Sequence, residues 1–110
     1  MKTTRLKRTL RTRTAAQEKL LRWSGPVDEA RLNRTLLRLM RAVRDRQHLS
    51  LHALEARSGI KRPQLRKLEQ ELMQLTLFTL VRWCNGLRLD IVGLLQLALL
   101  VLRQRPLYQQ

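Results

Sequence analysis

The sequence predicts an all-α fold, on three observations. Leu and Arg, which both favour helix, dominate the composition. Four Gly and three Pro among 110 residues leave few turns. Apolar residues recur at spacings of three and four along most of the chain. With 44% hydrophobic residues, we expect one small domain over residues 26–110, preceded by a basic arm over residues 1–25.

The chain is strongly basic, with a formal charge of +15 from 23 Lys or Arg against 8 Asp or Glu. Such an excess destabilises a compact domain through self-repulsion and is relieved by a polyanion. DNA, RNA and an anionic membrane surface are therefore the candidate partners. The uncharged run between Asp90 and Arg103 is 12 residues long, too short to cross a bilayer, so no membrane span is expected.

Few residues suggest catalysis or metal binding. The one cysteine, Cys84, lies in an apolar helical pattern and is expected to be buried. No cluster of His, Cys and carboxylates has metal-ligand spacing, so neither a metal nor a cofactor is expected. His48 and His52 have no pocket-forming loop beside them, which argues against an enzyme. The N-terminus lacks an apolar signal core, and a cytoplasmic location follows.

Residues 1–13 carry six Lys or Arg residues among Thr and Leu, with no acid between them. Because like charges at this density repel one another, we expect a mobile arm in the absence of DNA. An arm of this kind lies along phosphates or enters a minor groove, and an uninteresting tail is an equally good interpretation. Thr14 is a candidate cap for a short helix over residues 15–23, which Ser24-Gly25-Pro26 ends.

The next helix is predicted to run to about Gln47, with Asp28 and Glu29 in its first turn, where acids suit the helix dipole. One side is an apolar stripe that we expect in the core. The opposite side carries arginines, which are interpreted as a solvated face. The apolar stripe is Leu32, Leu36, Leu39, Met40 and Val43, and the arginines are Arg34, Arg38 and Arg41.

Residues 49–69, LSLHALEARSGIKRPQLRKLE, predict two short helices joined at a glycine, which is the layout of a helix-turn-helix. Ser50 is a good N-cap for a helix over residues 51–58, and Gly59 ends it. The second helix begins near Arg62, with Pro63 in its first turn, and is expected to reach Leu72. Its outer face carries Arg62, Gln64, Arg66, Lys67 and Gln70, while Leu54, Ile60, Leu65, Leu68 and Leu72 are expected to point inward.

Two helices are predicted in the last third of the chain. The first covers residues 77–85 and ends at the turn pair Asn85-Gly86. The second begins after the cap Asp90 and reaches about Gln104. It is apolar nearly all round, so it must be covered on more than one side. We expect a homodimer interface, with complete burial within one subunit as the alternative. The expected interface residues are Ile91, Leu94, Leu95, Ala98, Leu99 and Leu102.

Residues 39–95 resemble the Cro- and phage-repressor-like helix-turn-helix family, also called the xenobiotic-response-element type. The resemblance lies in LMRAVRDRQHLSLHALEARSGIKRPQLRKLE followed by LTLFTLVRWCNGLRLDIVGLL. Three positions depart from the family pattern. Glu55 stands where Ala is usual, Lys61 where Ser or Thr usually caps the second helix, and Glu71 where a glycine usually follows it.

The resemblance implies a lambda-repressor-like domain of five helices that binds double-stranded DNA as a dimeric repressor at a palindromic operator. The second helix of the motif would enter the major groove. Bases would be contacted by Arg62, Pro63, Gln64 and Lys67. Phosphates would be contacted by Ser50, Lys61, Arg66, Gln70 and, from the arm, Arg5, Lys7 and Arg8. No separate ligand-binding domain is present, so no small-molecule substrate is expected.

Two other interpretations remain open at this stage. One is a protein-interaction module, such as an antitoxin or adaptor that has a protein partner and autoregulates its operon. The apolar last helix and Glu55 favour that interpretation, and the cations of residues 61–67 oppose it. The other is an RNA-binding protein whose main contact is the basic arm.

Overall fold

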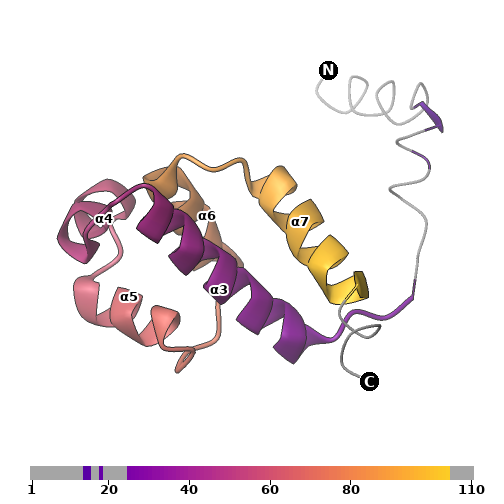
Figure 1. Cartoon of the computed structure of the whole chain (residues 1–110), viewed down its shortest axis with the longest axis horizontal. Coiled ribbons are helices and arrows are strands. Elements are labelled where there is room, and N and C mark those ends of the chain that lie inside the picture. The colour runs from indigo at the N-terminus through magenta and orange to yellow at the C-terminus, as the bar shows by residue number, and fades with distance from the viewer. Residues whose placement is uncertain (1–13, 16–17, 19–24, 105–110) are drawn as a thin grey trace, which may run out of the picture.

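The computed structural model describes residues 14, 15, 18 and 25–104 (Figure 1). Within residues 25–104 every regular element is an α-helix, which confirms the predicted fold class. The five helices are α3 (Glu29–Arg46), α4 (Leu51–Ser58), α5 (Arg62–Glu69), α6 (Leu77–Leu87) and α7 (Ile91–Gln104). The predicted arm, with Arg5, Lys7 and Arg8, and most of the predicted helix over residues 15–23 lie outside the described residues.

The long helix α3 forms one side of the core. Its start is capped by the carboxylate of Asp28, which accepts the backbone N–H of Arg31 at 3.2 Å. Leu36 and Met40 are buried, as the apolar stripe predicted, and the arginines of the opposite side are exposed. Helix α7 runs beside α3, while α4 and α5 pack at the other end of the molecule (Figure 1).

The two helices of the motif are joined as expected. Ser50 caps α4 through its hydroxyl, which accepts the backbone N–H of Ala53. Gly59 ends α4 at φ 76°, in the left-handed region that glycine enters without strain. Leu54 and Ile60 are buried, so both inward predictions are confirmed.

The predicted end of the second helix is wrong. Helix α5 stops at Glu69, because the N–H of Leu72 bonds the carbonyl of Lys67 and that of Glu71 bonds Leu68. This is a Schellman turn, with Glu71 in its left-handed position at φ 62°. The turn directs Leu72 into solvent, where it is 70% exposed, so the inward prediction for Leu72 is also wrong.

The predicted turn at Asn85-Gly86 is also wrong, because α6 continues to Leu87. Gly86 lies in the helix and faces α4. A Cβ atom on Gly86 would stand 2.8 Å from the Cβ atom of Ser58, closer than side chains approach. Glycine is therefore needed at this position for close packing of two helices. The helix ends at the next residue, Leu87, and is followed by the left-handed C-cap Arg88, whose φ is 56°.

The apolar core joins all five helices. Cys84 is buried in it, as expected, and burial raises the pKa of its thiol. From α7 the core takes one face only. The largest fully buried side chains include Trp83, Leu37, Met40, Leu54, Leu65, Leu68 and Leu87.

Candidate nucleic-acid interface

Helix α5 presents one polar stripe to solvent. Leu65 and Leu68 are fully buried and fix which way the helix faces. Residues three and four apart share a helix face, so the side opposite the leucines is a single row. That row consists of Pro63, Arg66, Lys67 and Gln70, all exposed.

The residues predicted to contact bases are not equally placed. Pro63 and Lys67 lie in the outward row, whereas Arg62 and Gln64 lie on its two edges. The side chain of Gln64 is half-buried, and that of Arg62 is 48% exposed and paired with Glu55. Among the described residues, therefore, only Pro63 and Lys67 of this set project outward without a described partner.

The residues predicted to contact phosphates lie in this row or beside it. Arg66 and Gln70, the C-cap of α5, belong to the row, and Lys61 is the exposed residue directly before the helix. Ser50 lies at the start of α4, where the unsatisfied backbone N–H groups favour an anion. Its oxygen accepts a backbone hydrogen bond, which leaves the hydroxyl hydrogen able to donate to an anion.

An ion pair between the part-buried Arg44 and the buried Glu69 ties α5 to α3. Nη2 of Arg44 donates to Oε1 of Glu69 at 2.7 Å, and Nη1 donates to the carbonyl of Leu49 at 2.8 Å. The hydrogen bond to Glu69 raises the pKa of Arg44 above its ordinary value. Sequence reasoning missed this pair. A pattern was available, since Arg44 follows Met40 by four residues on the core side, and Glu69 follows Leu65 by four.

A second acid holds the start of α5. Oε2 of Glu55 accepts the backbone N–H of Arg62 at 2.9 Å, and Oε1 lies 3.2 Å from Nε of Arg62. The hydrogen bond from that backbone N–H lowers the pKa of the Glu55 carboxyl. Lys61 makes no side-chain cap. Glu55 of α4 instead accepts the N–H of the first residue of α5, a different donor from the one that a Ser or Thr at position 61 would bond, so this end of the helix keeps a side-chain acceptor.

The third departure has a partner as well. Glu71, in its left-handed conformation, lies 3.4 Å from Arg38, measured from Oε1 to Nη2. Arg38 belongs to the exposed arginine side of α3, so this pair connects that side with the turn after α5. Each end of α5 is thus bonded to another helix through a carboxylate.

The helix-turn-helix family matches residues 40–94, which is half of the chain. The matched segment begins in the last turns of α3 and ends at the first turn of α7. The chain belongs to the helix-turn-helix family. Membership supports a role as a DNA-binding regulator of transcription, a class that is typically not enzymatic.

A solved structure has a similar fold. A mutant of the restriction-modification controller protein C.Esp1396I superimposes with a TM-score of 0.61 at 15% sequence identity, covering 71% of this chain and 98% of that one. At this identity the likeness concerns the fold of the helix-turn-helix domain. No curated protein sequence matches the chain.

The helix-turn-helix domain also leaves apolar surface uncovered. Leu94, Ala98 and Leu102 are buried within the chain, so their assignment to a subunit interface is corrected to the core. Leu95, part-buried, and Leu77, which is 72% exposed, line a groove between α3, α6 and α7 with Leu32, Leu36, Leu75 and Leu80. Ile91 and Leu99 are part-buried, and the exposed residues of α7 include Val92, Leu97 and Leu100.

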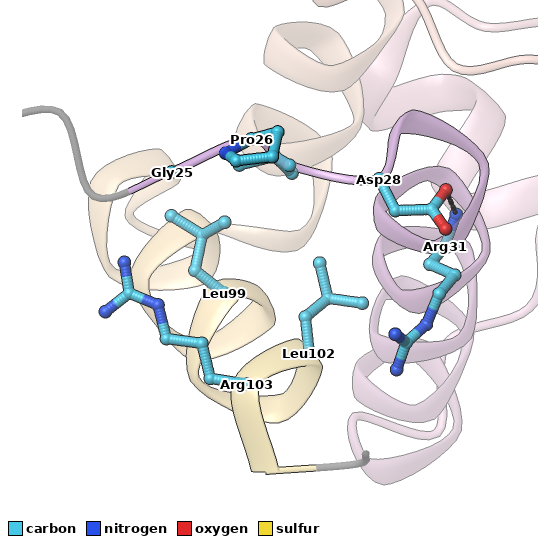
Figure 2. Close-up of a pocket in the computed structure, with 8 residues that line it drawn as sticks. Gly25, Pro26, Asp28, Arg31, Leu99, Leu102 and Arg103 are labelled. Carbon is cyan, nitrogen blue, oxygen red and sulfur yellow. Dashed lines mark hydrogen bonds between the residues drawn. The ribbon is translucent and has the colours of Figure 1, made fainter.

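A cavity of about 280 Å³ lies at the far end of the domain from α5, between the segment before α3 and the end of α7 (Figures 1 and 2). Leu99 and Leu102 line it on one side, and Arg31 and Arg103 border it. Because it is remote from α5, this cavity is not part of the motif surface. Among the described residues no single helix is long and apolar enough to cross a membrane, and α6 with α7 meets that length and composition only as a pair bent by 110°.

Proposed function

We propose that the chain is a sequence-specific repressor that binds double-stranded DNA as a homodimer at a palindromic operator, in the cytoplasm. The observation that carries the proposal is the outward row of α5, which presents cationic and amide side chains on a helix fixed by two buried leucines. A helix so presented fits the major groove, where base edges are read. The net charge of +15 supplies attraction to the phosphates.

Base reading is assigned first to Lys67 and Arg62, which donate to the O6 and N7 atoms of guanine. Pro63 packs on a thymine methyl group, and Gln64 reaches adenine from its half-buried edge. Phosphates are held by Lys61, Arg66 and Gln70, by Ser50 at the start of α4, and by the arm through Arg5, Lys7 and Arg8. This division separates side chains that select a sequence from those that set affinity and register.

A matched pair of neighbours on α5 tests the division. Lys67→Ala removes a base contact, and we expect it to relax the preference at one position in each half-site by about tenfold. Arg66→Ala removes a phosphate contact, and we expect weaker binding to all sequences with a salt slope reduced by about 1. A selection from random duplexes at defined salt measures both. Proportional loss on every sequence for Lys67→Ala contradicts its base-reading role.

The homodimer rests on the groove between α3, α6 and α7. An apolar groove with Leu77 and Leu95 on its rim accommodates the same residues of a second copy, as a two-fold interface requires. Two copies then place two α5 helices about 34 Å apart, one turn of DNA.

Leu77→Glu tests the dimer without disturbing the core, because Leu77 is 72% exposed. We expect a monomer in sedimentation and a much weaker complex with the operator. Leu97→Glu, a similar change on the opposite flank of α7, is the control and should remain dimeric. A wild-type chain that is monomeric at high concentration contradicts the dimer.

A repressor of this kind acts by covering a promoter. In this proposal the occupancy of the promoter is controlled by the concentration of the repressor or by a protein partner. A second candidate is an adaptor that binds a partner protein through the apolar groove and regulates its own operon as an antitoxin does. The exposed Leu77 and Phe78 favour it. A wild-type chain that selects no duplex sequence would favour the adaptor.

A further inference from the structure

Arg62 differs from the other cations of α5 in being held by an acid. Its Nε atom lies 3.2 Å from Oε1 of Glu55, while Oε2 of the same carboxylate accepts its backbone N–H. Within the part of the chain that the structure describes, no ion pair holds Arg66 or Lys67. One carboxylate on α4 therefore accepts a hydrogen bond from the backbone of the first residue of α5 and forms an ion pair with its side chain.

This contact decides which edge of the guanidinium is left to bind DNA. An Arg side chain donates through five N–H groups, one on Nε and four on the two Nη atoms. With Nε facing Glu55, the Nη1 and Nη2 end remains for a new partner. Two parallel donors match the O6 and N7 acceptors of guanine.

The same carboxylate opposes DNA binding in a general way. Glu55 is an acid at the edge of a surface that approaches phosphates, so it repels every duplex whatever its sequence. The side chain of Glu55 is 26% exposed, which keeps its charge close to that surface. An acid in this position lowers affinity for all DNA, and a gain in selectivity is the benefit that offsets this cost.

We infer that Glu55 is a positioning residue for sequence selectivity, which orients Arg62 so that its Nη1 and Nη2 end meets one guanine in each half-site. The inference rests on the proposed DNA-binding function. It assigns to α4 a part in base selection, through Arg62 and without contact between Glu55 and DNA.

The test separates the two tasks of Glu55. Glu55→Gln keeps an oxygen that accepts the backbone N–H of Arg62 but removes the charge that holds Nε. Glu55→Ala with Lys61→Ser removes the carboxylate and restores a cap to α5 from the adjacent residue. A selection from random duplexes at fixed salt compares the full wild-type chain with these two Glu55 variants, with Arg62→Ala and with the double variant Glu55→Gln/Arg62→Ala. Circular dichroism first shows that each variant is folded.

We expect the wild type to select guanine at a position where Arg62→Ala selects none. Both Glu55 variants should reduce that guanine preference about tenfold and leave the other positions unchanged. Affinity of Glu55→Gln for random duplex should rise because an acid beside the phosphates is removed, so the lost guanine preference is not a general loss of binding. The double variant should match Arg62→Ala at that position, because Glu55 acts through Arg62.

Three results overturn the inference. One is an unchanged guanine preference in both Glu55 variants. Another is an equal loss of preference at every position. The third is a wild-type preference that Arg62→Ala leaves in place, which removes the base-reading role of Arg62 while the DNA-binding function stands. A wild type that selects no sequence defeats the proposed function itself and is distinguished from these by that absence.

Discussion

Helices α5 and α7 are held to the same long helix by different means. Helix α5 buries two leucines and is bonded at its ends by carboxylates, Glu69 to Arg44 of α3 and Glu55 of α4 to Arg62. Helix α7 lies along α3 through Leu94, Ala98 and Leu102. One helix is oriented by directional polar contacts, and the other is held by burial of apolar area.

The difference matches what each helix exposes. The two buried leucines set which way α5 faces, and the directional contacts restrict its rotation further, so the row of Pro63, Arg66, Lys67 and Gln70 faces one way. Apolar burial has no direction, and α7 remains apolar beyond the face that α3 covers, with Leu100 52% exposed. The first arrangement suits reading of a surface with a fixed pattern, and the second suits association with another apolar surface.

The largest expected effect comes from removing the ion pair that holds α5 to α3. Arg44→Met leaves the Glu69 carboxylate, 8% exposed, without its partner, and we expect a loss of about 3–5 kcal/mol in the free energy of unfolding. Denaturant unfolding measures the loss. Arg41→Met, an exposed arginine on the same helix, should change stability by no more than about 0.5 kcal/mol. If the double variant Arg44→Met/Glu69→Leu is no more stable than Arg44→Met, an unpaired buried charge is not the cause.

The next largest effect comes from truncating a buried apolar side chain of α7. Leu94→Ala removes a buried side chain of α7 that is 6% exposed, and we expect a cost of about 2–5 kcal/mol in the free energy of unfolding. Leu97→Ala on the exposed part of the same helix should cost little. Similar losses for both, measured by denaturant unfolding in a Leu77→Glu background that removes the proposed dimer, contradict the burial described for α7.

A smaller effect tests the support beneath α5. Gly86→Ala places a methyl group against Ser58 at the end of α4, and overpacking of this kind costs about 1–3 kcal/mol. The neighbouring exposed position provides the control, since Asn85→Ala adds no such contact. Thermal unfolding compares the two. An alanine at position 86 that stabilises the protein shows that α4 and α6 do not approach as closely as described.

The smallest expected effect is the pH dependence of the stability that the Glu55 carboxylate contributes. Its pKa is lowered in the folded state, so its contribution to stability is present above the ordinary carboxyl value of 4.5 and is lost as the pH falls through the folded-state pKa. We expect wild type to be more stable than Glu55→Gln at pH 7, and the difference to shrink below pH 4.5. Melting temperatures of both proteins from pH 7 to pH 3 measure it. A difference that does not change with pH means that the charge of Glu55 contributes nothing.

Local patterns in the sequence were enough to predict the helices and most of their inward faces. Caps at Ser50 and Gly59, and the spacing of Leu65 and Leu68, depend on residues within about four positions of one another. Their effect is the same whatever the rest of the chain does. The motif and its outward cations were predicted on that basis, and the positions of Pro63, Arg66 and Lys67 agree with it.

The remaining features depended on residues far apart in the chain. Arg44 meets Glu69 across 25 residues, and packing of α6 on α4 made Gly86 part of a helix rather than a turn. Glu71 in a left-handed turn ended α5 at Glu69, with Arg38 of α3 beside its carboxylate. Sequence periodicity showed that α7 is apolar, but it did not show which side faces α3, because residues all round that helix are equally suited to burial. Only the packed structure selected Leu94, Ala98 and Leu102 for the core and left Leu97 and Leu100 outside.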